Sequence, residues 1–72
     1  MTDISPRDAS VLALIAGHQL NSTQAEGLLR KAKSGPATRR IATVLVRPKA
    51  RAGKADKEAA AAIRHWADTL SR

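Results

Sequence analysis

Apolar residues recur at helical spacing in several stretches of the chain, and short polar segments separate these stretches. In the first stretch, within residues 6–17, the apolar side chains are Val11, Leu12, Leu14 and Ile15. In the second, the side chains at the i, i+3, i+4, i+7 positions are Ala25, Leu28, Leu29 and Ala32. Because this spacing places side chains on one helix face, both stretches are predicted to be amphipathic helices.

Polar residues in front of both stretches are typical of helix starts. Ser5 can accept hydrogen bonds from first-turn amides, Pro6 suits the first helical position, and Asp8 can reach back as in a capping box. Asn21 and Gln24, or Ser22 as an alternative, can cap the second helix in the same way.

The expected stops and restarts lie in two short segments. Gly17, or the His18-Gln19 pair after it, is expected to end the first helix. Gly35 can end the second helix, and Pro36 can begin a third.

The third element has two interpretations. As a helix over residues 37–47, it would place Ala37, Ile41, Val44 and Leu45 on one side. As a strand, residues 41–46 are rich in β-branched side chains, but a lone strand needs a partner and no second run is convincing. We favour the helix, and Pro48 would end either element.

A fourth helix is predicted to begin at Ala55 or Asp56. Its expected apolar face is Ala55, Ala59, Ala62, Ile63, Trp66 and Leu70. In so short a chain this face either closes the monomer's own core or pairs with a second copy, and we favour a homodimer through Ile63, Trp66 and Leu70. The predicted fold class is all-α: residues 1–72 form a single basic helical domain of four helices, helix-turn-helix-like, with an exposed basic loop at 48–54.

Positive charge gathers in the middle of the chain. The formal net charge is +7, and residues 34–54 hold six Lys/Arg and no acid. Mutual repulsion in such a block costs stability unless a polyanion neutralises it, so we expect a polyanionic partner. With Trp66 as its one aromatic residue, the chain lacks the stacking platforms of single-strand binders, which favours duplex DNA.

The order of a short helix, a turn with glycine and a helix with basic outer residues is the plan of a helix-turn-helix domain. Residues 5–17, SPRDASVLALIAG, also resemble the first helix of LuxR-type DNA-binding domains. The resemblance ends there, because residues 21–35 are longer than that family's second helix and turn. It implies helix-turn-helix architecture and assigns no functional residue.

On the helical interpretation, Arg39, Arg40 and Thr43 face outward and can reach base edges. The segment 47–54, RPKARAGK, resembles the short Arg/Gly/Pro arms that enter A·T-rich minor grooves. The full set of predicted DNA-binding residues is Arg30, Lys31, Lys33, Arg39, Arg40, Thr43, Arg47, Lys49, Arg51 and Lys54.

Other classes find little support in the residues. There is no cysteine, and His18 and His65 are far apart, so we expect no metal site and no cofactor. The acids form no spaced pair and no phosphate loop is present, so we do not expect an enzyme. The N-terminus does not resemble a signal peptide and no stretch is long enough to span a membrane, so a cytoplasmic protein is expected.

Two functions therefore remain. The first is a small duplex-DNA-binding protein, such as a phage- or plasmid-type transcriptional regulator. The second is a protein-interaction module, such as an anti-activator, antitoxin or virion component, that docks on an acidic partner.

Overall fold

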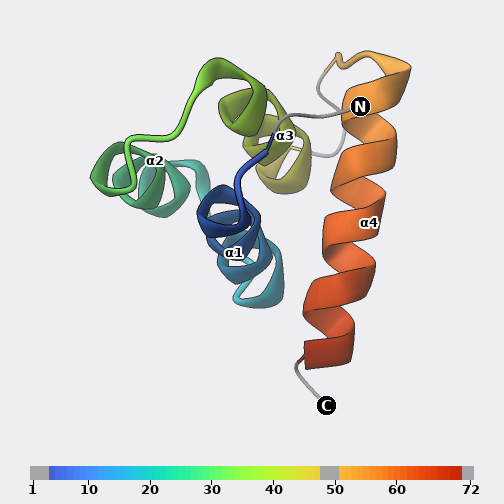
Figure 1. Cartoon of the computed structure of the whole chain (residues 1–72), viewed down its shortest axis with the longest axis horizontal. Coiled ribbons are helices and arrows are strands. Elements are labelled where there is room, and N and C mark those ends of the chain that lie inside the picture. Colours follow the sequence, from blue (N-terminus) through green and yellow to red (C-terminus); the bar gives the residue numbers. More distant parts are fainter. Residues whose placement is uncertain (1–3, 48–50, 71–72) are drawn as a thin grey trace.

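The computed structural model describes residues 4–47 and 51–70, and these form four helices. The helices are α1 (Pro6–Gly17), α2 (Ser22–Lys31), α3 (Pro36–Val46) and α4 (Lys54–Leu70) (Figure 1). The described residues contain no strand, so the strand interpretation of residues 41–46 is wrong and the helical one is confirmed. The helix is favoured over a strand because it buries Ile41, Ala42 and Val44 against the rest of the protein.

The starts of the first two helices follow from their caps. The Ser5 hydroxyl accepts a hydrogen bond from the Asp8 amide at 3.1 Å, and Pro6 takes the first helical position. At α2 the Asn21 side chain accepts from the Gln24 amide at 2.9 Å. The Gln24 side chain accepts in return from the Asn21 amide at 3.1 Å, which completes the predicted capping box.

Each of the first two helices is followed, after its C-cap, by a left-handed residue other than glycine. Gln19 (φ 50°) and Lys33 (φ 55°) take the position after the C-cap, where glycine is the usual residue. The next amides, those of Leu20 and Ser34, donate back to Ile15 and Leu29, as in a Schellman motif. Gly35 does not end α2 as expected, because it is the N-cap of α3.

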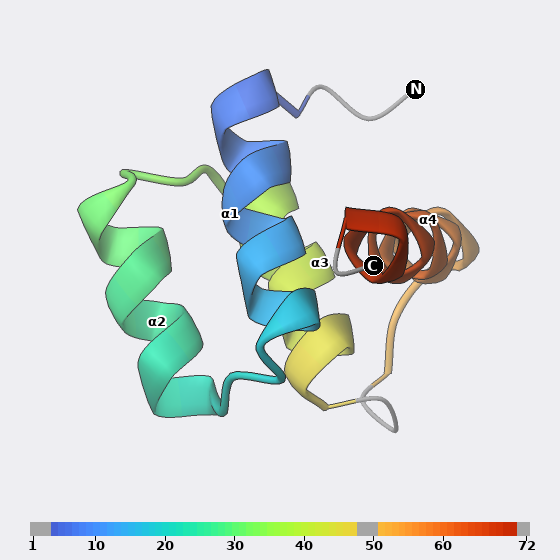
Figure 2. The same cartoon turned by 90° about the horizontal axis from the view of Figure 1, so that it is seen from below.

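The core lies where α1 and α3 meet, with α2 and α4 on either side (Figure 2). Both α1 and α3 contact every other helix, whereas α2 and α4 do not touch each other. The buried cluster consists of Leu12, Ile15, Ala25, Leu29, Ile41, Ala42, Val44 and Ala60. Its small size and alanine content match the composition of the chain.

The α4 helix is rotated relative to the predicted face. Ala60 and Ala67 are its buried residues, with Ala59 and Ile63 partly buried beside them. Trp66 and Leu70 remain exposed. Small side chains therefore face α1 and α3, and the bulky ones lie at the edge of the contact.

Asp8 joins three parts of the chain. Its carboxylate does not reach back to the N-cap; it accepts hydrogen bonds from Ser34 at 3.2 Å and Thr38 at 3.0 Å. Both hydroxyl residues are buried, so Asp8 satisfies polar groups that would otherwise be costly to bury. The start of α1 is thereby tied to the α2–α3 turn and to α3.

Candidate nucleic-acid interface

A shallow groove of about 220 Å³ separates α2 from α3. Ser22 and Glu26 border it on α2, and Arg39, Thr43 and Arg47 border it on the side of α3. Two of the predicted basic residues of the third element, Arg39 and Arg47, thus share one groove with a single acid of α2.

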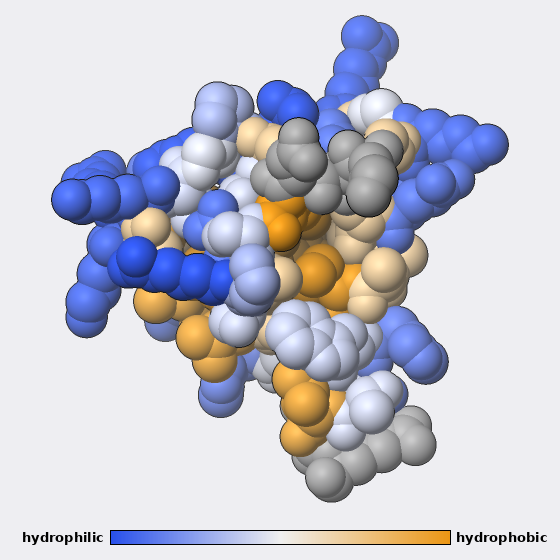
Figure 3. Space-filling view, viewed as in Figure 1, coloured by the Kyte–Doolittle hydropathy of each residue, from blue (hydrophilic) through white to orange (hydrophobic). Residues whose placement is uncertain are grey.

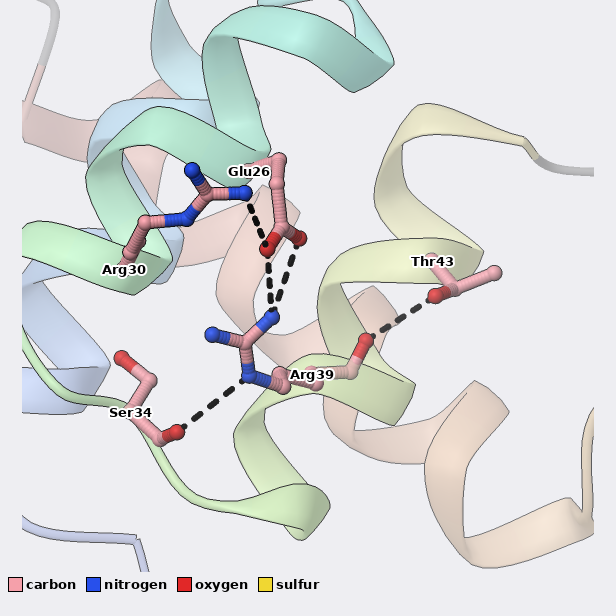
Figure 4. Close-up of polar contacts among 5 residues, drawn as sticks. All are labelled: Glu26, Arg30, Ser34, Arg39 and Thr43. Atoms are coloured by element: carbon pink, nitrogen blue, oxygen red, sulfur yellow. Dashed lines mark hydrogen bonds and ion pairs between the residues drawn. The ribbon is translucent and has the colours of Figure 1, made fainter.

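Arg39 is held inside this groove and does not face outward as predicted. One terminal nitrogen of its guanidinium donates to both carboxylate oxygens of Glu26, at 2.8 and 3.0 Å (Figure 4). Its Nε donates to the carbonyl of Ser34 at 3.4 Å. The Arg39 side chain is half-buried. It lies against α2 because Glu26 of that helix provides a partner of opposite charge.

Glu26 also attracts a second cation. Arg30, one turn further along α2, lies 3.7 Å from the same carboxylate (Figure 4). The hydrogen bond from Arg39 is the main reason that the pKa of Glu26 is lowered, and the charges of Arg39 and Arg30 act in the same direction. One anion thus holds two arginines, and one positive charge of the three groups stays uncompensated.

Arg40 and Thr43 also have intramolecular contacts. Arg40 lies 3.4 Å from Asp56 of α4, although 60% of its side chain remains accessible. The Thr43 hydroxyl donates to the Arg39 carbonyl at 3.0 Å within α3, and the residue is exposed (Figure 4). Of the three residues expected to face bases, Thr43 and Arg40 are accessible and Arg39 is retained by Glu26.

Of the remaining predicted basic positions that the structure describes, Arg47 alone lines the groove. Lys31, Lys33, Arg47 and Arg51 are exposed and have no acidic partner among residues 4–47 and 51–70. Lys54 makes a long, exposed contact of 4.0 Å with Glu58. Lys49 lies outside the described residues. Arg64, which the pattern did not single out, donates to the Val44 carbonyl at 2.9 Å and satisfies the C-terminal end of α3.

The residues expected to form a dimer seam divide between two environments. Ile63 packs against the core, whereas Trp66 and Leu70 line a separate groove with Leu14 of α1. The exposure of Leu14 was not foreseen, because the periodicity of the first stretch placed it within one broad apolar stripe.

The described part of the chain holds neither a cluster of metal-binding side chains nor a membrane-spanning helix. No three His, Asp or Glu side chains there lie close enough together to hold a metal ion. None of its helices is long and apolar enough to cross a membrane.

Comparisons with known proteins give no information about this site. The chain matches no family model, no curated protein and no solved structure.

Proposed function

We propose that this chain is a small duplex-DNA-binding protein whose α2–α3 groove faces the nucleic acid. The observation that carries the proposal is the charge of that groove. Arg39 and Arg47 line it, together with Glu26 as its one carboxylate. Arg30 does not line the groove, but it lies 3.7 Å from the Glu26 carboxylate. The three arginines and Glu26 together carry a net charge of +2, and the exposed Lys31 and Lys33 near the C-terminal end of α2 add positive charge outside the groove.

In the proposed complex, α2 and α3 act as a helix-turn-helix unit, with α3 in the major groove. A recognition helix needs accessible polar side chains near base edges and cations near phosphates. Arg40 and Thr43 are accessible on α3 and suit the first role. Lys31, Lys33, Arg47 and Arg51 suit the second, because exposed lysines and arginines neutralise phosphate without requiring a particular base. Reading of this kind is what a small transcriptional regulator requires.

Glu26 gives the proposal a sharp test, because it is an acid in the middle of the proposed DNA face. Its carboxylate would repel phosphate and it holds Arg39 away from the duplex. Glu26→Gln should therefore bind duplex DNA more tightly than wild type, with a salt dependence steeper by about one unit of slope per additional phosphate contact.

Glu58→Gln is the matched control. Glu58 is an exposed acid of α4, so both variants raise the net charge by the same amount. Fluorescence anisotropy with a labelled duplex, measured from about 50 to 200 mM salt, compares the two. We expect Glu58→Gln to bind closer to wild type than Glu26→Gln does, because Glu58 does not line the α2–α3 groove and its contact is with the exposed Lys54 of α4.

Three outcomes would count against the proposal. Wild type that binds no duplex at about 50 mM salt and micromolar concentration would exclude duplex binding. Equal effects of the two substitutions would show that net charge, and not the α2–α3 groove, drives the binding. Binding to an acidic protein but to no duplex would favour the protein-interaction module.

A further inference from the structure

A second groove lies on the other side of α1, between α1 and the C-terminal half of α4. It has a volume of about 420 Å³. Figure 3 shows hydrophobic surface in the seam between these two helices and at the C-terminal end of α4. The large hydrophobic side chains left exposed among the described residues all line it: Leu14 (47% exposed), Trp66 (39%) and Leu70 (62%). Such a gathering on a small, charged protein indicates an interaction surface.

We propose that a second copy of this chain docks on the α1–α4 groove through a two-fold symmetric contact. A two-fold interface uses the same patch on both copies, so the patch must carry both projections and a hollow. The projections here are Leu14, Trp66 and Leu70, and the small residues between them are Ala13, Gly17 and Ala67. The bulky side chains of one copy can thus lie over the small residues of the other.

Charge also favours a second copy at this groove over any other face. Two copies with a net charge of +7 repel each other, and no residue lining the groove is a lysine, arginine or acid. The basic start of α4 at Lys54 lies about 24 Å from Leu70, at a rise of about 1.5 Å per residue. The basic end of α2 lies beyond α1, because α2 and α4 do not touch. Docking here keeps the like charges of the two copies apart.

The exposed apolar area sets the expected strength of the contact. A standard interface buries about 800 Å² per partner, which is roughly 15% of this chain's 5176 Å² of accessible surface. Three partly exposed side chains supply the centre of such an area and not the whole of it. We therefore expect a weak, reversible dimer with a dissociation constant of roughly tens to hundreds of micromolar.

The inference rests on the groove and not on DNA binding, so its test contains no nucleic acid. Sedimentation equilibrium of the wild type at about 0.3 M salt, where the Debye length is below about 8 Å, should show association that rises with concentration. Trp66 provides a second readout, because it is the only aromatic residue of the chain. Its emission should shift to shorter wavelength as the indole leaves water in the dimer.

Leu70→Glu and Ala61→Glu form a matched pair for this test. Both residues are exposed on α4, and nine residues of helix place them on opposite sides of it. Leu70→Glu should weaken association by about tenfold or more, as for a central interface residue, while Ala61→Glu should behave like wild type.

The proposal fails if wild type stays monomeric up to about 500 μM with no shift in Trp66 emission, since the predicted dissociation constant lies below that concentration. Such a result would leave the groove to a different protein. Equal association of the two variants, with wild-type helix content in both, would place the contact between copies elsewhere and overturn the proposal as well.

Discussion

The Glu26–Arg39 contact shows how a single acidic side chain can make an arginine of a basic helix unavailable to an external partner. Helical periodicity correctly separates Arg39 from the buried face of α3, yet its guanidinium lies across the groove on a carboxylate of α2 at 2.8 Å. The pairing depends on the rotation of α3 relative to α2. That rotation is fixed by packing of Ala25, Leu29 and Ala42 and is not encoded in either segment alone.

This contact predicts an acid-dependent coupling between Glu26 and Arg39. The pKa of Glu26 is lowered from its ordinary value of 4.5, mainly by the Arg39 hydrogen bond. A carboxyl whose pKa is lower when folded contributes stability above its unfolded pKa, and this contribution is lost as the pH falls through its folded pKa. Urea unfolding of wild type, Glu26→Gln, Arg39→Gln and the double variant forms a complete cycle.

We expect the two single substitutions to be non-additive at neutral pH and additive in acid below the lowered pKa of Glu26. Because the pair is partly exposed, the coupling at neutral pH should be small but measurable. Additivity at both pH values would mean that the pair does not form in solution.

Among the elements, the starts of α1, α2 and α3 were predictable because local chemistry determines them. Ser5, Asn21 and Pro36 act within a few residues of their own positions. The rotation of α4 was not predictable in this way. Ala59, Ala60, Ala61 and Ala62 are equally apolar, so the sequence favours the side with the bulkiest residues, whereas the structure buries the side that allows the closest approach of helices.

Two alanines of α4 distinguish these faces experimentally. Ala60 is fully buried against the core, whereas Ala62, which belongs to the predicted face, is exposed. Ala60→Leu should destabilise the fold by about 1–3 kcal/mol, because added methyl groups have no space in a packed core. Ala62→Leu should change the free energy of unfolding by no more than about 0.5 kcal/mol.

Urea unfolding of both variants, with equal gains in side-chain volume, gives the comparison. If Ala62→Leu were the more destabilising of the two, the buried face of α4 would be the predicted one, which contains Ala62 and Trp66. Trp66 and Leu70 would then be expected to be buried.

Over the whole molecule, charge and apolar surface lie on different sides of α1. The α2–α3 groove carries Arg39 and Arg47 against a single acid, Glu26, and the α1–α4 groove carries the exposed hydrophobic side chains. Composition alone indicated the excess of positive charge and the small core. It could not separate the two surfaces, because Leu14 and Trp66 are 52 residues apart in the sequence and meet only through the packing of α1 on α4.

An uncompensated charge of +7 on so small a protein should make its stability depend on salt. Repulsion among exposed cations is screened as the ionic strength rises from about 20 to 500 mM, where the Debye length falls from roughly 20 to 4 Å. The four ion pairs between described residues weaken over the same range, but all are partly exposed and contribute little. We therefore expect the melting temperature to rise with salt by about 2–4 °C, equivalent to about 0.5 kcal/mol.

Lys31 and Lys33 identify the source of this effect, because both are exposed and neither has an acidic partner in the described part of the chain. The variant with glutamine at both positions should melt at a higher temperature than wild type at low salt. At high salt the two proteins should melt at the same temperature. The matched arginine pair keeps the charge and should follow wild type throughout. A melting temperature that falls as salt is added would mean that the ion pairs of Glu26 and Asp56 outweigh the repulsion, and that the basic surface is already neutralised within the protein itself.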